Sequence, residues 1–275
     1  MTKVACAQLA PRVGELEANV AMSIDSVRHC VSTGADIVVL PELVTSGYVF
    51  RGREEATAVA ITAAHPVFTD WAEQAGASTD GSAVVVGGFC EDGGNGRLYN
   101  SAAVVDASGV RAVYRKAHLW DREKLYFTPG DALPPVIDTA HGRIGVLICY
   151  DLEFPEWTRT LALAGAELVT CPTNWPLVGR PDGERAPEVI IAMAAARVNR
   201  MAIACCDRTG TERGQEWTAG TTIIGADGWV LAETGAHVAV SADIDMTASR
   251  DKALTSLAHL IDDRRPGLYG QLSRP

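Results

Sequence analysis

The sequence predicts a mixed α/β fold in which helices cover sheets of short strands. Runs of β-branched residues alternate along the chain with longer stretches that have the spacing of an amphipathic helix. The chain has 275 residues, 47% hydrophobic and 21% charged, so it can bury a sizeable core. No Pro/Ser/Gly-rich linker, charge block or internal repeat marks a boundary. We therefore expect one domain over residues 1–275, with a tail from about residue 246.

The first half of the sequence begins with the order strand, helix, strand. An amphipathic stretch at 16–31 lies between apolar runs at 4–9 and 37–40. An Ala-Ser-Gly turn at 107–109 joins two later strands, so the middle of the chain is expected to be locally antiparallel. The other elements expected here are a helix at 66–77 and strands at 83–89, 99–106 and 110–114.

The second half repeats this alternation and then turns to hairpin-like strands. Pro155 suits the first position of a helix, because the N–H that proline lacks has no partner there. The Asp227-Gly228 pair is typical of a tight turn between strands. The polar residues after about 246 are expected to form a helix and an extended tail. The expected strands are 143–148, 168–171, 202–206, 221–224, 229–233 and 238–244, and the expected helices are 155–164 and 186–199.

Composition argues against several kinds of partner and location. The formal net charge of −10 leaves no basic excess to neutralise phosphates, so we expect no nucleic-acid partner. No apolar run approaches the roughly 18–20 residues that span a bilayer, so we expect no membrane partner. The N-terminus reads directly into a strand and lacks the pattern of a secretory signal. These features predict a cytoplasmic protein.

The motifs of metal and cofactor sites are missing from the sequence. The seven cysteines are odd in number and form no C-x-x-C pair, and several lie in apolar runs where cysteine behaves as a small hydrophobe. No H-E-x-x-H, phosphate-loop or G-x-S-x-G motif occurs, and the glycine cluster at 93–96 reads as a turn. We expect no disulfide framework, no metal site and no cofactor.

Cys149 stands where a buried run at 143–148 stops at a polar turn. Backbone N–H groups after such a corner, notably that of Tyr150, are free to donate to a developing oxyanion. A buried apolar cysteine is the more common role for such a residue, so position alone does not decide between the two.

Glu42 and Lys116 also end strand patterns. A carboxylate after the apolar run at 37–40 is costly unless it is used or paired, although Glu42 also suits a turn or helix cap. Desolvation there would raise its pKa toward the range of a general base. Strand alternation sends Arg115 and Lys116 to opposite sides, so one of them faces inward unless both are solvated cations at an edge.

A thiol, a carboxylate and an ammonium fit one chemistry. The thiolate attacks an amide carbonyl, a proton passes to the leaving nitrogen, and water hydrolyses the thioester. A buried Lys116 would supply positive charge against the tetrahedral intermediate. Because Glu42, Lys116 and Cys149 all terminate strand patterns, we expect them to meet at one sheet edge.

Three motifs resemble those of the nitrilase superfamily of carbon–nitrogen hydrolases. They are Pro41-Glu42 within LPELVTSGY, Arg115-Lys116-Ala-His118 within YRKAHLW, and CYDLEFPE at 149–156, in the order of the family. The resemblance extends from the N-terminal strand to about Asp245. It implies an αββα sandwich that usually dimerises into an αββααββα assembly, and a small amide as substrate.

The resemblance also implies a role for individual residues. Cys149 resembles the nucleophile of the family, Glu42 its general base and acid, and Lys116 the cation that stabilises the tetrahedral intermediate. The family frequently has a second glutamate that orients the substrate and tunes the residues matched here by Glu42 and Lys116. Glu123 is the best match to it in this sequence, and the alternative is that Glu123 is a solvated charge on a loop. The substrate-binding residues that the resemblance implies are Tyr150 through its backbone N–H, Asn174, Trp175 and His118, the last more typical of a structural histidine.

The residues after Cys149 favour one branch of the family. Tyr-Asp-Leu-Glu-Phe-Pro-Glu resembles amidases more than true nitrilases, which usually carry Trp-Glu-Asn there. The Arg-Arg that often follows in carbamoylases is absent, so no clamp for an amino-acid carboxylate is evident. The expected activity is an amidase that releases a carboxylic acid and ammonia. The alternatives are an N-carbamoyl amide hydrolase and, less favoured, a nitrilase or a catalytically idle binding protein.

Overall fold

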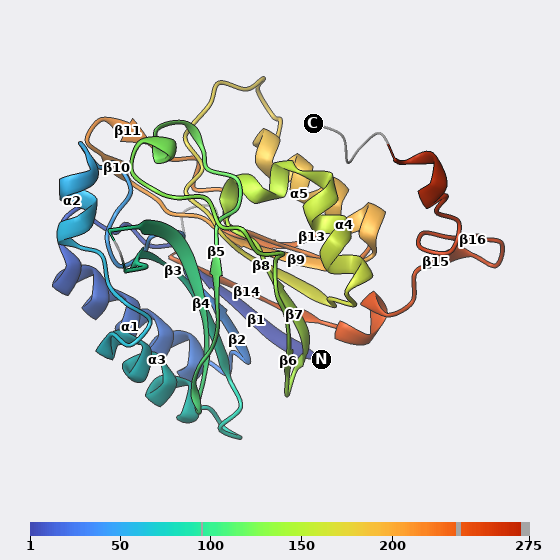
Figure 1. Ribbon diagram of the computed structural model, residues 1–275. Coiled ribbons are helices and arrows are strands. Elements are labelled where there is room, and N and C mark those ends of the chain that lie inside the picture. Colours follow the sequence, from blue (N-terminus) through green and yellow to red (C-terminus); the bar gives the residue numbers. More distant parts are fainter. Residues whose placement is uncertain (95, 235–237, 271–275) are drawn as a thin grey trace.

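Two six-stranded sheets pack face to face in the computed structural model (Figure 1), which describes all residues except 95, 235–237 and 271–275. The first sheet contains, in spatial order, β14 (Ala239–Ile244), β1 (Thr2–Ala7), β2 (Ile37–Val39), β3 (Val84–Asp92), β4 (Leu98–Asp106) and β5 (Gly109–Arg115). The second contains β13 (Val230–Glu233), β12 (Thr222–Ile224), β9 (Ala202–Cys206), β8 (Leu168–Pro172), β7 (Gly142–Val146) and β6 (Val136–Thr139).

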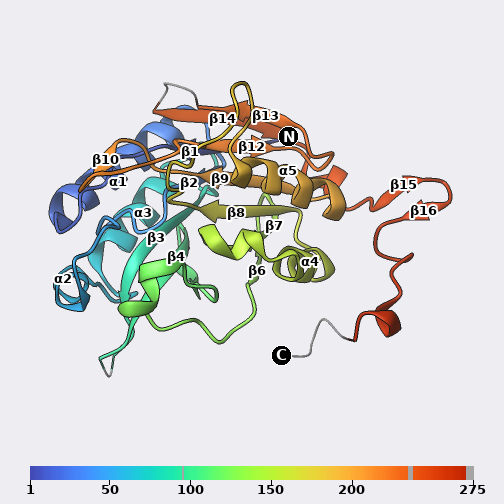
Figure 2. The same cartoon turned by 90° about the horizontal axis from the view of Figure 1, so that it is seen from above.

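Helices cover the outer face of each sheet. The first sheet carries α1 (Leu16–Ser32) and α3 (Pro66–Gly76), and the second carries α4 (Pro155–Leu163) and α5 (Pro187–Asn199), as Figure 2 shows from above. The layers therefore run helix, sheet, sheet, helix, and the expected αββα sandwich is confirmed. The smaller elements are α2 (Arg53–Ala58), the pair β10 (Thr211–Glu212) and β11 (Gln215–Glu216), and short 3₁₀ helices at Asp121–Leu125 and Cys149–Glu153.

Alternate side chains of the first sheet serve two different cores. Ile37 and Val39 pack into the core between the sheets, whereas Val38 packs with side chains of the covering helices. This division follows from the two-residue period of a strand. Because both faces of each sheet are covered, the strands read as nearly continuous apolar runs. The antiparallel middle of the chain is also as expected, since β3 pairs with β4 and β4 with β5.

Two expectations for the end of the chain are wrong. The strand at 238–244 does not continue the hairpin of β12 and β13; as β14 it pairs antiparallel with β1, with Thr2 opposite Ile244. This pairing joins distant segments, so local pattern does not reveal it. In place of the helix expected after 246, the described residues form 3₁₀ helices at Met246–Ser249 and Pro266–Leu268 and a hairpin of β15 (Ala253–Thr255) and β16 (Ala258–His259).

Two observations bear on membranes and redox state. Across the described ranges, no helix combines the length and the apolar character needed to cross a bilayer. All seven cysteines are buried free thiols.

Gly88 allows β3 to approach the turn that carries Glu42. Its N–H donates to Pro41 O at 3.1 Å, and its carbonyl accepts from Val44 N at 2.9 Å. A Cβ at this position would lie 2.5 Å from Leu43 N and 2.6 Å from Glu42 Cα, which is closer than atoms can approach. The missing side chain therefore sets the place of Glu42 against the sheet.

We expect Gly88→Ala to lower the free energy of unfolding by about 1–3 kcal/mol, because the backbone of the Glu42 turn must move to admit a methyl group. Urea denaturation followed by circular dichroism measures this change. Gly179→Ala is the control, since a Cβ there meets no atom within 4 Å. Equal stability of both variants would contradict the close approach.

Candidate active site

The polar side chains of the site follow the ends of strands in both sheets. Glu42 and Lys116 come after β2 and β5 of the first sheet, and Cys149 and Asn174 come after β7 and β8 of the second. Strands β7 and β8 are parallel, so the segments after them leave the same edge of their sheet. The two sheets are joined here, because Asn174 Nδ2 donates to the backbone oxygen of Glu42 at 2.8 Å.

Lys116 lies between two carboxylates in the interior. Its Nζ donates to Glu42 Oε1 at 2.7 Å and to Glu123 Oε1 at 2.8 Å. The side chains of Lys116 and Glu42 are 0% exposed and that of Glu123 is 2% exposed. Of the two adjacent cations, Lys116 therefore faces inward, while Arg115 pairs with Glu91 at 2.6 Å. Strand alternation required one inward cation without indicating which.

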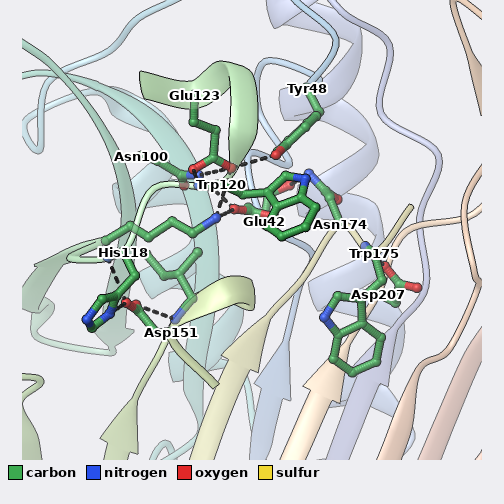
Figure 3. Close-up of polar contacts among 12 residues, drawn as sticks. Glu42, Tyr48, Asn100, His118, Trp120, Glu123, Asp151, Asn174, Trp175 and Asp207 are labelled. Carbon is green, nitrogen blue, oxygen red and sulfur yellow. Dashed lines mark hydrogen bonds and ion pairs between the residues drawn. The ribbon is translucent and has the colours of Figure 1, made fainter. Parts of the chain in front are cut away.

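Neighbouring side chains hold this cluster in place. Figure 3 shows Tyr48, Asn100 and Glu42 gathered near Glu123. Tyr48 Oη donates to Glu123 Oε1 at 2.6 Å, and Asn100 Nδ2 donates to Glu42 Oε1 at 2.7 Å. The backbone N–H of Trp120 donates to Glu123 Oε2 at 3.1 Å. Sequence reasoning gave no role to Tyr48 or Asn100. The available signal for Asn100 was a polar residue inside an apolar strand, and that for Tyr48 was its place at the end of the LPELVTSGY motif.

The surroundings of Glu42 bring the pKa of its carboxyl group close to neutral pH. Burial raises the pKa of Glu42 to about 7, with the charge of Glu123 adding to the rise and the charge of Lys116 opposing it. Burial alone would lower the pKa of Lys116, but Glu123 and Glu42 raise it well above its ordinary value. Glu42 Oε2 is buried and accepts no hydrogen bond from the described residues. This oxygen is available to take a proton.

Cys149 lies on a strained turn beside this cluster. Its φ of 46° falls in the left-handed region, which is uncommon for residues other than glycine. The residue is 6% exposed, and burial and the charge of Glu42 raise the pKa of its thiol well above the ordinary value. The charge of Lys116 and a hydrogen bond from the Asn174 backbone oppose the rise. The resting sulfur is therefore a protonated thiol that needs a base nearby.

The turn after Cys149 supplies backbone donors. Tyr150 lies in the first turn of the 3₁₀ helix Cys149–Glu153, where N–H groups have no acceptor within the helix. Asp151 fixes this turn: it is fully buried and accepts from Ile148 N at 3.2 Å and from Tyr114 Oη at 2.8 Å. Sequence reasoning did not single out Asp151.

His118 supports the same turn from outside the cavity described below. Its Nδ1 lies 2.7 Å from Asp151 Oδ1, and its backbone N–H donates to the same oxygen at 3.1 Å (Figure 3). Its ring stacks on Phe154 with 3.7 Å between the ring centroids. The residues that line the cavity do not include His118.

A small cavity of about 50 Å³ opens onto Cys149. This volume suits a compact substrate group and not a bulky one. Larger hollows, such as one of about 400 Å³ lined by Arg180 and Thr218, contain none of the strand-end residues of this site. Among the described residues, no group of three or more His, Cys, Asp or Glu is arranged to hold a metal ion. The cavity is lined by Trp120, Cys149, Tyr150, Glu153, Asn174, Trp175, Pro176 and Glu188.

Asp207 anchors one wall of this cavity. It directly follows β9 and is fully buried, and its Oδ1 accepts from the backbone N–H groups of Trp175 and Arg208, each at 2.9 Å. Its Oδ2 accepts from Gly220 N at 2.9 Å. Burial raises its pKa to about 7, against these backbone donors. Sequence reasoning missed Asp207, although it ends a strand just as Glu42 and Cys149 do.

Comparison with known proteins shows which family this chain is similar to. Residues 3–252 match the carbon–nitrogen hydrolase family. A protein of Pyrococcus abyssi named nitrilase is 35% identical, across 98% of this chain and 99% of its own length. An (R)-stereoselective amidase of a Pseudomonas species is 34% identical, across 98% of this chain and 93% of its own.

A solved structure shares the whole fold. It is a mutant of the amidase from Nesterenkonia sp. AN1 that shows Michael addition of acrylamide at the active-site cysteine. Its TM-score with this chain is 0.79 at 25% sequence identity, and the match covers 99% of this chain and 100% of that one. The order of layers, the match along nearly the full sequence and the likeness to these relatives lead to one conclusion: the chain belongs to the carbon–nitrogen hydrolase family, within the nitrilase superfamily.

Proposed function

We propose that this protein is an amidase that hydrolyses small carboxamides to a carboxylic acid and ammonia through a thioester on Cys149. One observation carries the proposal: the charges of a buried carboxylate, Glu42, and a buried ammonium, Lys116, both shift the pKa of the Cys149 thiol, and one oxygen of that carboxylate accepts no hydrogen bond from the described residues. Among the relatives, the Pseudomonas amidase and the cysteine adduct of the Nesterenkonia amidase support it.

The reaction needs one proton to move twice. Glu42 accepts the thiol proton while the sulfur of Cys149 bonds to the carbonyl carbon, forming a tetrahedral intermediate. The new oxyanion accepts hydrogen bonds from Lys116 Nζ and from the N–H of Tyr150. Glu42 then gives its proton to the leaving nitrogen, the C–N bond breaks, and ammonia departs from the thioester.

Hydrolysis of the thioester repeats these roles. Glu42 takes a proton from water as the water oxygen attacks the thioester carbonyl, and Lys116 again faces the oxyanion. The C–S bond breaks, the carboxylic acid leaves, and the proton returns to the sulfur of Cys149. Throughout, Glu123 holds Lys116 in place through the contact of 2.8 Å.

N-carbamoyl hydrolysis is the second candidate, because Glu42, Lys116 and Cys149 would serve it equally. The two activities differ in product, since a carbamoyl substrate releases carbon dioxide together with ammonia. The sequence context of Cys149 favours the simple amide over a carbamoyl group or a nitrile.

We also propose that the protein is a cytoplasmic homodimer in which residues 1–275 form one hydrolase domain, with a tail from about residue 246. The resemblance of the three motifs to the family supports the dimer.

Replacement of the nucleophile tests the proposed reaction. We expect Cys149→Ala to lower ammonia release from a panel of primary amides by about three orders of magnitude or more, because no thioester forms. Mass spectrometry of the parent protein should detect the acyl group on Cys149, and carbon dioxide measurement separates carbamoyl substrates. Circular dichroism shows whether the variant is folded. A folded Cys149→Ala protein with the turnover of the parent protein would contradict the covalent mechanism.

The pH profile tests the base. Because Glu42 has a raised pKa of about 7, it is protonated below this pH and cannot accept the thiol proton. We expect kcat/KM to fall about tenfold per pH unit below about pH 7. Glu42→Gln should remove this acid limb and lower the rate by about 10²- to 10⁴-fold. Glu156→Gln, at an exposed position, is the control that keeps the limb. A rate that stays flat from about pH 5 to 7 in the parent protein argues against Glu42 as base.

A third variant tests whether Glu123 tunes Glu42. The charge of Glu123 raises the pKa of Glu42, so Glu123→Gln should move the acid limb of kcat/KM to lower pH while lowering the maximum rate. The control is Asp121→Asn, an exposed acid in the same short helix. The solvated charge that the sequence left open is excluded, because the Glu123 side chain is 2% exposed. An acid limb that stays at the parental pH in Glu123→Gln, as in Asp121→Asn, would contradict the tuning of Glu42.

A further inference from the structure

The cavity at Cys149 has an anionic and aromatic lining. Glu153 and Glu188 both line it, together with the rings of Trp120, Tyr150 and Trp175. No lysine or arginine is among the described residues of this lining. Aromatic faces and carboxylates share one preference, since both attract cations. The ammonium of Lys116 lies outside this lining, buried against Glu42 and Glu123.

Unpartnered acceptor atoms accompany this lining. Asn174 is 1% exposed, and its Oδ1 is buried and accepts no hydrogen bond from the described residues, while its Nδ2 is bound to the Glu42 carbonyl. Glu188 Oε2 is likewise buried without a partner in the described structure. Buried acceptors of this kind are costly unless a donor reaches them. The lining therefore holds two buried acceptor atoms that no donor of the described structure reaches.

The two carboxylates also act on each other. Burial raises the pKa of Glu153, and the charge of Glu188 raises it further. Two like charges near one small cavity repel, and a bound cation would offset both the repulsion and the loss of water. An apolar substrate group would instead leave the buried oxygen of Glu188 without a donor.

We propose that the amide substrate carries a protonated amine, which Glu153 and Glu188 bind against the faces of Trp120, Tyr150 and Trp175. This inference rests on the proposed amidase function and names its substrate class. The ammonium donates to the two carboxylates and to Asn174 Oδ1, while the carbonyl carbon lies against the sulfur of Cys149. A substrate with a carboxylate at the same place would meet repulsion.

Three amides of matched length test this selectivity. γ-Aminobutyramide, valeramide and glutaramate place an ammonium, a methyl group or a carboxylate at the same distance from the same carboxamide. We expect kcat/KM for the cationic amide to exceed that for valeramide by about 10- to 100-fold, with glutaramate slowest. A second set with one methylene fewer, β-alaninamide, butyramide and succinamate, covers a shorter reach.

Variants of Glu153 and Glu188 test whether these two carboxylates cause the preference for the cationic amide. Glu153→Gln with Glu188→Gln should bring the ratio of kcat/KM for γ-aminobutyramide to that for valeramide close to one. Glu184→Gln is the control, because this exposed carboxylate lies shortly before α5, the helix that carries Glu188, and does not line the cavity. It should keep the parental ratio. An equal loss of preference in Glu184→Gln would mean that overall charge, and not this site, selects the cation.

A binding measurement that needs no turnover accompanies the kinetics. Propylammonium should slow alkylation of Cys149 by iodoacetamide in the parent protein and not in the double variant. Preference for the methyl or the carboxylate amide in both sets, without protection by propylammonium, would overturn the inference and leave the proposed amidase function intact. Protection by propylammonium without hydrolysis of any amide would overturn the proposed function instead, because the cation site would then serve another reaction.

Discussion

The site depends on one ammonium shared by two buried carboxylates. Removing three charged groups from water costs several kcal/mol per ion, and only close contacts with good geometry offset it. Here Lys116 meets Glu42 and Glu123 at 2.7 and 2.8 Å, and Tyr48 and Asn100 donate further hydrogen bonds. Burial raises the pKa of Glu42 to about 7, and the charge of Glu123 adds to this rise while that of Lys116 opposes it. A proton therefore binds Glu42 more readily than it binds an ordinary glutamate.

The residues of the site come from both sheets. The first sheet carries the ion cluster and the second carries the thiol, so the core between the sheets sets the distance between Glu42 and Cys149. The hydrogen bond from Asn174 to the Glu42 backbone joins the two layers beside these residues. The left-handed turn at Cys149 and the absence of a side chain at Gly88 are local adjustments that this close packing requires.

The charges of the site form an ordered series from the interior to its opening. Lys116 supplies positive charge in the interior, Glu42 lies beside it, and Glu153 and Glu188 bring negative charge to the cavity lining. A substrate with an electron-rich carbonyl at one end and an ammonium at the other matches this series. Such a match orients the substrate before reaction, and it favours approach of cations to a chain whose net charge is −10.

By itself, the sequence determined the layered α/β fold and the strand-end positions of Glu42, Lys116 and Cys149. Buried helices and strands show a regular spacing of apolar residues along the sequence, and these three residues stand where that spacing ends. Strand alternation required one inward cation after β5 without choosing between Arg115 and Lys116, and the resemblance of the motif named Lys116. Only the tertiary structure decided that Glu42 and Glu123 share Lys116, that β14 joins β1, and which groups line the cavity. Those contacts join segments far apart along the chain. Their geometry depends on how two sheets pack, and no local pattern of residues records that.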